Sequence, residues 1–223
     1  MRVLYVFLQS IIGLAIIAVA WIAASVVIQD TNKLPALGSV VNRALELATS
    51  DSYQEHVNAS TSVLLRGLLP AIAGGILFGF IAGISSVFRW LLGPLFVTLA
   101  AVPLIALMPL LLLWFGLGPS LTATAVAIIT VFPVANVVMM SLASRQNHVA
   151  LAIVRGLRWG VVVGASALVI CEMLAARAGA GTFIMTAGAQ FNTVGVAAGI
   201  MLVFVPLIAI VAILQGIEEQ LAA

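Results

Sequence analysis

The chain has 223 residues, of which 64% are hydrophobic and only 7% are charged, and its formal net charge is +2. Its mean hydropathy of +1.28 excludes a water-soluble globular domain, because so few polar side chains cannot cover the surface of a chain of this length. The nine basic residues are scattered and indicate no nucleic-acid-binding surface. Lys33 is the only lysine, which excludes a phosphate-binding loop ending in Gly-Lys-Ser/Thr.

The sequence contains no cluster of residues typical of a catalytic, cofactor-binding or metal-binding site. Cys171 is the only cysteine and lies in an apolar run, so we expect a buried hydrophobic side chain rather than a reactive thiol. His56 and His148 are far apart, and neither has a cysteine nearby. We therefore predict no enzymatic activity, no cofactor, no metal site and no nucleic-acid partner.

Six apolar segments approach the length of about 20 residues that a helix needs to cross a membrane. They cover residues 3–28, 63–84, 90–115, 121–142, 150–175 and 194–217. The first segment begins with Met-Arg, as signal peptides do, but its apolar core exceeds the ~7–15 residues of a signal peptide. We therefore predict an uncut anchor, and one all-α transmembrane domain of six helices over residues 1–223.

Residues 31–60 form the one extended polar stretch of the chain. Its apolar residues fall near helical spacing, which predicts a short amphipathic helix lying on the membrane surface. These residues are Leu37, Val40, Val41, Leu45 and Leu47. Because six spans place both termini on the same side of the membrane, this segment lies outside the cell membrane if the termini are cytoplasmic.

The basic residues favour cytoplasmic termini by a margin of one. Arg2, Arg89, Arg145, Arg155 and Arg158 then lie at the cytoplasmic ends of spans, against Lys33, Arg43, Arg66 and Arg177 outside. Arg155 and Arg158 are three residues apart and share one face of a helix. We expect them to reach lipid phosphates; in a transporter they would instead border the transport path.

Two patterns in the apolar segments concern helix packing. Gly75, Gly79 and Gly83 recur every four residues and form one smooth stripe, which predicts a close contact with a neighbouring helix. Pro94, Pro103 and Pro109 interrupt the third span and predict kinks, because proline lacks an amide donor. Broken helices often line substrate paths in transporters, although proline kinks are also ordinary in membrane helices.

Glu172 is the only carboxylate in the predicted spans, and a bare charge inside a membrane is costly. Arg177 follows five residues later, and Arg66 is predicted near the same surface. These three residues form the predicted buried-charge cluster. An ion pair or a hydrogen-bonded anchor is the favoured interpretation, and a substrate ligand is the alternative.

Several motifs, in the same order, resemble the permease subunit of bacterial ABC importers, in the branch that takes up nitrate, sulfonates and taurine. The matching residues are Val102 to Gly118, Val131-Phe132-Pro133, Gly156-Leu157-Arg158 followed by Glu172, and Gly179-Ala180-Gly181. The resemblance implies a multi-pass protein of the bacterial inner membrane with both termini cytoplasmic. It also implies an ATPase, a solute-binding protein and a second permease copy as partners.

One segment departs from the family pattern. The family carries a long cytoplasmic loop with an "EAA" signature, gripped by the ATPase, where this chain has only 23 positions from Pro133 to Gly156. No acidic residue lies between Glu55 and Glu172. We therefore predict a non-transporting accessory subunit, with membrane lipid and other integral membrane subunits as partners and without an ATPase. The alternative is a working permease for a small anion such as nitrate, a sulfonate or taurine.

Overall fold

The computed structural model describes residues 2–101, 104–144 and 148–222, and these residues form helices and no strand. Five helices are long and apolar enough to cross a membrane. They are α1 (Arg2–Ile28), α3 (Asp51–Ile84), α6 (Pro119–Ala143), α7 (Val149–Ala175) and α9 (Thr193–Leu221). The prediction of an all-α membrane bundle is confirmed. The shorter helices are α2 (Leu37–Ala48), α4 (Ser86–Ala101), η1 (Leu104–Leu107), α5 (Met108–Phe115) and α8 (Ala180–Ala189).

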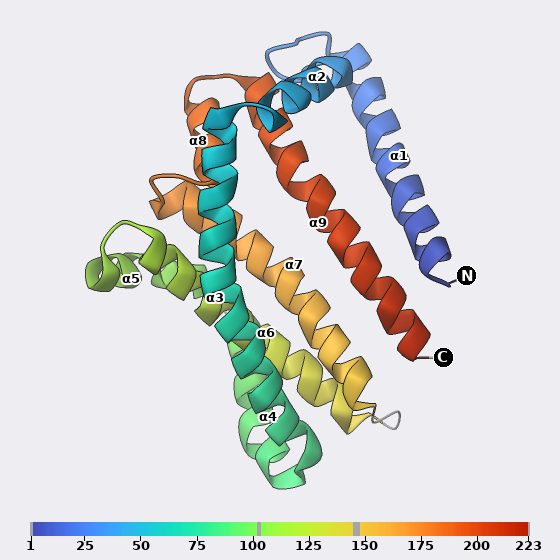
Figure 1. Ribbon diagram of the computed structural model, residues 1–223, viewed down its shortest axis with the longest axis vertical. Helices are drawn as coiled ribbons and strands as arrows, with labels where there is room; N and C mark the ends of the chain where they lie inside the picture. The colour runs from blue at the N-terminus through green and yellow to red at the C-terminus, as the bar shows by residue number, and fades with distance from the viewer. Residues whose placement is uncertain (1, 102–103, 145–147, 223) are drawn as a thin grey trace.

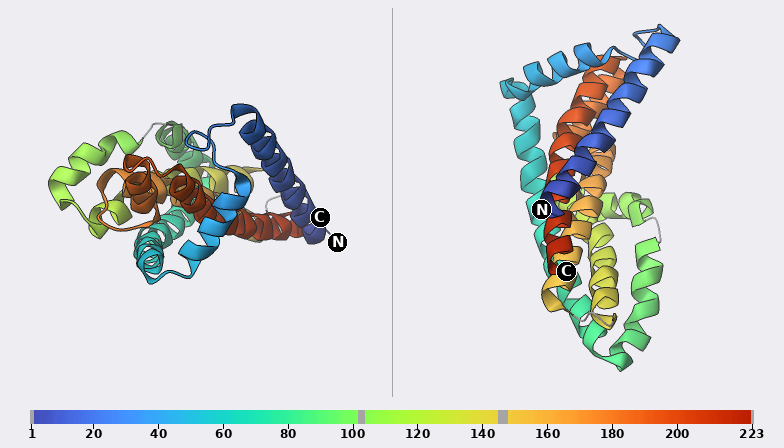
Figure 2. Two further views of the ribbon diagram at one scale, coloured as in Figure 1. Left: turned by 90° about the horizontal axis from the view of Figure 1, so that it is seen from above. Right: turned by 90° about the vertical axis from the view of Figure 1, so that its right-hand side faces the viewer.

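The centre of the bundle is formed by α3, α6 and α7, and α9 packs on α7 with α1 alongside it (Figures 1 and 2). In Figure 1 the beginning of α1 lies at the right with the end of α9 below it, and the α3–α4 turn and the adjoining ends of α6 and α7 lie at the bottom. We call this side the terminal face. Helices α2, α5 and α8 lie on the opposite face. The beginning of α1 and the end of α9 thus lie on the same side of the bundle.

Glycines bring α3 and α6 into close contact. A Cβ atom added to Gly75 would lie 2.7 Å from Val134 Cβ, and one added to Gly79 would lie 2.5 Å from the carbonyl oxygen of Ala135. Gly83 meets Leu142 in the same way, at 2.7 Å. Because these distances are too short for any side chain, the backbones pack directly. The stripe of small residues predicted to pack on a neighbouring helix therefore faces α6.

The predicted third span over residues 90–115 is not one helix. It is divided into α4, η1 and α5, and α5 runs across the direction of α4 (Figures 1 and 2). Pro94 lies inside α4 and Pro109 in the first turn of α5. Pro109 has no N–H to donate to the carbonyl four residues earlier, so an α-helix cannot continue unchanged through it. Pro103 lies outside the described residues.

The polar stretch predicted over 31–60 also divides differently. Only α2 forms the short amphipathic helix, and residues from Asp51 onward already belong to α3. The apolar face of α2 carries Val40 and Ala44, which pack with Tyr53 of α3 and Ala198 of α9. Part of the apolar face of α2 is therefore buried in the protein, rather than facing only the membrane surface. Helix α8 is an additional element that the sequence patterns do not predict.

Candidate functional site

Glu172, near the C-terminal end of α7, is the most deeply buried charged side chain in the described part of the chain, with 1% of its surface exposed. Ser60 Oγ of α3 donates a hydrogen bond to Glu172 Oε1 over 2.7 Å, and the amide nitrogen of Gly181 donates to Oε2 over 2.9 Å. The ion pairs formed by the described residues do not include Glu172. Neutral donors therefore hold this carboxylate.

The same contacts cap the beginning of α8. The first amides of a helix have no partner inside the helix, and here three consecutive ones are paired with side chains. Gly179 N donates to His56 Nδ1 over 3.1 Å, Ala180 N to Ser60 Oγ over 2.8 Å, and Gly181 N to Glu172. A carboxylate at a helix N-terminus also interacts favourably with the helix dipole. The cluster thus ties α3, α7 and α8 together.

The glycines of the Gly179-Ala180-Gly181 motif are required by this geometry. Gly179 has a φ angle of +141°, a conformation that other residues rarely adopt. A Cβ atom on it would lie 2.3 Å from Glu172 Cδ, and a Cβ atom on Gly181 would lie 2.4 Å from the carbonyl oxygen of Val169. Side chains at either position would push α8 away from the carboxylate.

Arg66 and Arg177 are not part of a buried-charge cluster, contrary to the sequence-based prediction. Both side chains are exposed, and neither pairs with Glu172. They line one cavity of about 370 Å³, together with Ser62, Thr122 and Glu172. Glu172 takes its hydrogen bonds from Ser60 and Gly181 instead, because these donors are already in place around the start of α8. The cavity therefore presents two guanidinium groups without a partner in the described residues.

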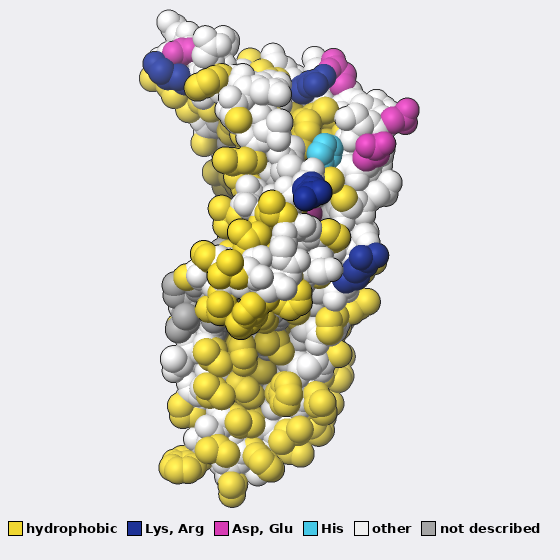
Figure 3. Space-filling model, turned by 90° about the vertical axis from the view of Figure 1, so that its left-hand side faces the viewer, with side chains coloured by type: hydrophobic (Ala, Val, Ile, Leu, Met, Phe, Trp, Pro, Cys, Tyr) yellow, Lys and Arg dark blue, Asp and Glu magenta, His cyan; other side chains and the backbone are white. Residues whose placement is uncertain are grey.

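Charged side chains gather in the upper part of the face shown in Figure 3, and the lower part is almost entirely hydrophobic. This division places the polar groups of that face near α2, α8 and the adjoining part of α3, and a continuous apolar surface below them. The apolar surface matches the interior of a bilayer. The charged upper part would then meet headgroups or water.

A second charged cluster joins α7 and α9 near the terminal face. Arg155 Nε lies 2.8 Å from Glu218 Oε1 and forms a hydrogen bond with it, and Arg158 Nε lies 2.8 Å from Oε2 without hydrogen-bond geometry. The two arginines thus contact a carboxylate, a partner that the sequence analysis did not identify. Arg89 donates to the carbonyls of Ala82 and Gly83 at the end of α3. Arg145 lies outside the described residues.

The sequence analysis missed Ser60 and His56 as parts of the Glu172 cluster. They are four residues apart and therefore share one face of α3, which is the only signal that the sequence offers for them. Their partners lie more than 110 residues away along the chain. A contact over such a distance follows from the packing of α3 against α7 and α8.

Comparison with known proteins gives a consistent set of relatives. No family model matches the chain. The chain is 27% identical to the taurine transport system permease protein TauC of Escherichia coli over 216 residues, covering 84% of this chain and 78% of TauC. It is 25% identical to the putative aliphatic sulfonates transport permease protein SsuC of Bacillus subtilis, covering 89% and 80%. It is 26% identical to the riboflavin transport system permease protein RibX of Chloroflexus aurantiacus, covering 72% and 68%.

Proposed function

We propose that this chain is a permease-type membrane subunit uncoupled from any ATPase. The premise is that its homologues are ABC transporter permeases. The chain lies in the bacterial inner membrane with both termini, and hence the terminal face, in the cytoplasm. Its partners are membrane lipid and other integral membrane subunits. It serves a larger membrane assembly as a packing subunit and does not move solute by itself.

The observation that carries this proposal is the short connection between α6 and α7. Helix α6 ends at Ala143 and α7 begins at Val149, so only Ser144 to His148 remain to form a contact outside the bilayer. A stable protein interface buries about 800 Å² on each partner, which a connection of five residues does not supply. ATP-driven motion reaches a membrane domain only through contacts that differ between its states.

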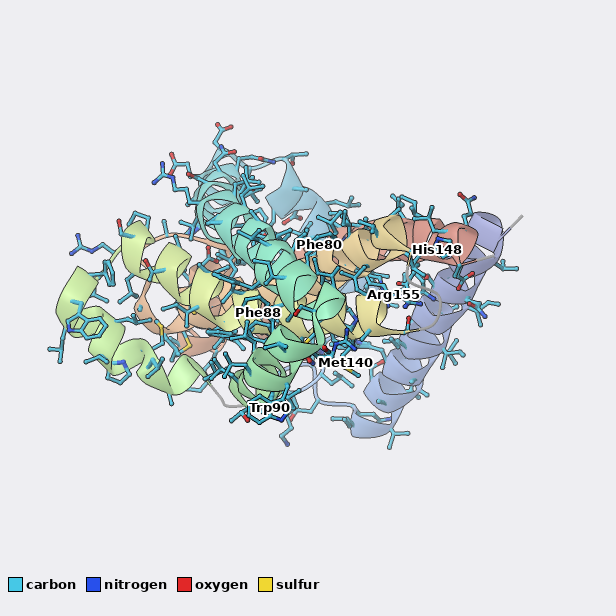
Figure 4. The ribbon with its side chains drawn as sticks, turned by 90° about the horizontal axis from the view of Figure 1, so that it is seen from below. Phe80, Phe88, Trp90, Met140, His148 and Arg155 are labelled. Atoms are coloured by element: carbon cyan, nitrogen blue, oxygen red, sulfur yellow. The ribbon has the colours of Figure 1, made fainter. Side chains whose placement is uncertain are left out.

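The rest of the terminal face supports the same proposal. Seen from below, Phe80, Phe88, Trp90 and Met140 lie around the α3–α4 turn, whereas His148 lies to one side at the start of α7 (Figure 4). The exposed fractions of Trp90 and Met140 are 81% and 60%. Exposed aromatic and thioether groups suit acyl chains or another membrane subunit better than a soluble ATPase.

The lengths of the alignments also favour a shortened chain. The alignment with TauC extends over 216 positions, but it covers 84% of this 223-residue chain, which is about 187 residues. The alignment with SsuC extends over 222 residues and covers 89% of this chain, with the same consequence. Both permeases therefore have aligned positions at which this chain has no residue. We attribute this difference to a segment lost between α6 and α7.

The direct test is purification of the full chain from its own host membranes in mild detergent, with and without a non-hydrolysable ATP analogue. We expect integral membrane proteins to co-purify, and no nucleotide-binding subunit. A matched variant replaces Ser144 to His148 with the connection between the corresponding helices of TauC, and it is expressed with the ATPase subunit that TauC uses. We expect the graft to recover that ATPase. A stoichiometric ATPase bound to the native chain would refute the proposal.

A second candidate function is a working permease for a small anion such as nitrate, a sulfonate or taurine. It is favoured by one observation, the cavity lined by the unpaired Arg66 and Arg177. Guanidinium groups without a carboxylate partner can donate hydrogen bonds to sulfonate and nitrate oxygens. Uptake of labelled taurine by cells that express the chain tests it, with Arg66→Gln and Arg177→Gln in one variant. The control is Arg43→Gln, because Arg43 is exposed and contacts Glu46. Uptake that is lost only in the double variant would establish this function.

A further inference from the structure

A second cavity, of about 410 Å³, lies between α4, α6 and α7 and shares no lining residue with the cavity of Arg66 and Arg177. Its walls include Leu99 of α4, Ile129, Pro133 and Asn136 of α6, and Trp159 and Val163 of α7. These residues of α6 lie in the middle of the helix, far from either end. The cavity therefore lies at membrane depth.

One buried polar group without a partner, on Asn136, belongs to the lining of this apolar space. Asn136 Oδ1 is buried and accepts no hydrogen bond from the described residues. Pro133 has no N–H, so the helical hydrogen bond to the carbonyl of Ile129 is missing, and Ile129 is also a lining residue. Trp159, 43% exposed, has an indole N–H that can donate. Buried polar groups in proteins are almost always hydrogen-bonded, so the unpaired Asn136 Oδ1 indicates a missing partner, and the Trp159 side chain lines the same cavity.

The charge of the cavity restricts that partner. Its lining contains no Asp, Glu, Lys or Arg. The Arg158 guanidinium lies 6.0 Å from the centre of the Trp159 ring, and it already faces Glu218. An ion would lose its hydration without gaining an opposite charge. The partner is therefore neutral, with an N–H or O–H for Asn136, an acceptor for the Trp159 indole, and an apolar body for the remaining wall.

We propose that the cavity between α4, α6 and α7 is a binding site for a small neutral amide-like or hydroxyl-bearing molecule, held by Asn136 and Trp159. The site does not depend on the proposed loss of ATPase coupling, because none of its residues lies on the connection between α6 and α7. The site also takes another class of ligand than the cavity of Arg66 and Arg177. Either proposal can therefore be refuted while the other stands.

Benzamide is a suitable probe, because it combines an amide donor and acceptor with an apolar ring. The full chain, with Trp21, Trp90 and Trp114 replaced by Phe, reports on the cavity through the fluorescence of Trp159 alone. We expect a saturable change with benzamide, at least tenfold weaker binding of the equally shaped anion benzoate, and no saturable change with toluene, which fills the space without hydrogen bonds. Equal responses to benzamide and toluene would show a merely greasy cavity and overturn the proposal.

Variants on α6 separate binding from folding. Asn136→Leu removes the unpaired amide and is expected to weaken benzamide binding at least tenfold while raising the thermal unfolding midpoint of the ligand-free protein. The matched control is Thr130→Val: Thr130 Oγ1 is also buried without a partner, but Thr130 does not line the cavity. We expect it to leave benzamide binding unchanged. Unchanged binding in Asn136→Leu, or a lowered unfolding midpoint for it, would overturn the proposal.

Discussion

Each end of α7 takes part in a cluster around a carboxylate, but the two clusters are built differently. The first carboxylate belongs to α7 itself and the second to α9. Near the C-terminal end, Glu172 is 1% exposed and accepts hydrogen bonds from a hydroxyl and a backbone amide. Near the N-terminal end, Arg155 and Arg158 face Glu218 of α9, and these side chains remain 15–27% exposed. One contact uses a short side-chain hydroxyl and a backbone amide, and the other uses two long, flexible cations.

The difference shows how position decides the way in which a charge is accommodated. Donors that belong to the backbone lose no side-chain entropy when they bind, but they tolerate no displacement. Arginines near a membrane surface can exchange a carboxylate for water or lipid phosphate at little cost. We therefore expect changes around Glu172 to lower stability more than changes around Glu218, in the order given by the following predictions.

The largest expected effect is that of Gly179→Ala. The new Cβ would meet the carboxylate of Glu172 at 2.3 Å, and the residue would keep a φ angle of +141°. We expect a loss of at least about 3 kcal/mol in the free energy of unfolding, measured by thermal or denaturant unfolding in detergent. The control is Gly188→Ala in the same helix, where the new Cβ has an ordinary contact at 3.8 Å. A similar loss in both variants would contradict the role of the close approach.

Ser60→Ala is expected to have the next largest effect. It removes the hydroxyl that both donates to Glu172 and accepts from Ala180 N, so two buried groups lose a partner. The expected loss is about 2 kcal/mol. Ser62→Ala on the same helix is the matched control, because Ser62 lines the cavity of Arg66 and Arg177 and takes no part in this cluster. Equal unfolding curves for the wild type and Ser60→Ala would show that the cluster does not hold α8.

Glu172→Gln should cost less, about 1 kcal/mol, because glutamine keeps the shape and one acceptor while removing a buried charge. The unfolding midpoint and the yield of assembled protein measure this effect. For the second candidate function, the working permease, the same variant tests the role of Glu172. If Glu172 only anchors α8, uptake of labelled taurine by an active preparation stays near the wild-type level. Loss of uptake with normal assembly would place Glu172 on a transport path instead.

Glu218→Gln is expected to have the smallest effect, about 0.5 kcal/mol, because lipid phosphates and water can replace the carboxylate beside Arg155 and Arg158. Unfolding in detergent with and without anionic lipid checks this, and added anionic lipid should reduce the loss further. Glu46→Gln is the control, because Glu46 pairs with Arg43 in an exposed ion pair. A loss larger than that of Ser60→Ala would reverse the proposed ranking of the two ends of α7.

Local patterns of the sequence predicted most of the helices. The apolar runs that became α1, α6, α7 and α9 agree with the structure to within a few residues at each end, because length and hydropathy suffice to recognise such segments. The four-residue spacing of Gly75, Gly79 and Gly83 predicted a helix contact, because residues at this spacing share one face of a helix. The interruption between α4 and α5 was indicated by prolines, but hydropathy alone merged the pieces into one span.

The sequence by itself determined that the chain is a helical membrane protein resembling ABC importer permeases, because those properties are written in composition and in the order of local motifs. Only the tertiary structure decided that Glu172 accepts from Ser60 and Gly181 rather than from Arg66 or Arg177. It likewise decided that Asn136 has no partner. A side chain's spacing along a helix tells which face it shares, whereas its partner depends on which other helices pack against that face and at what distance.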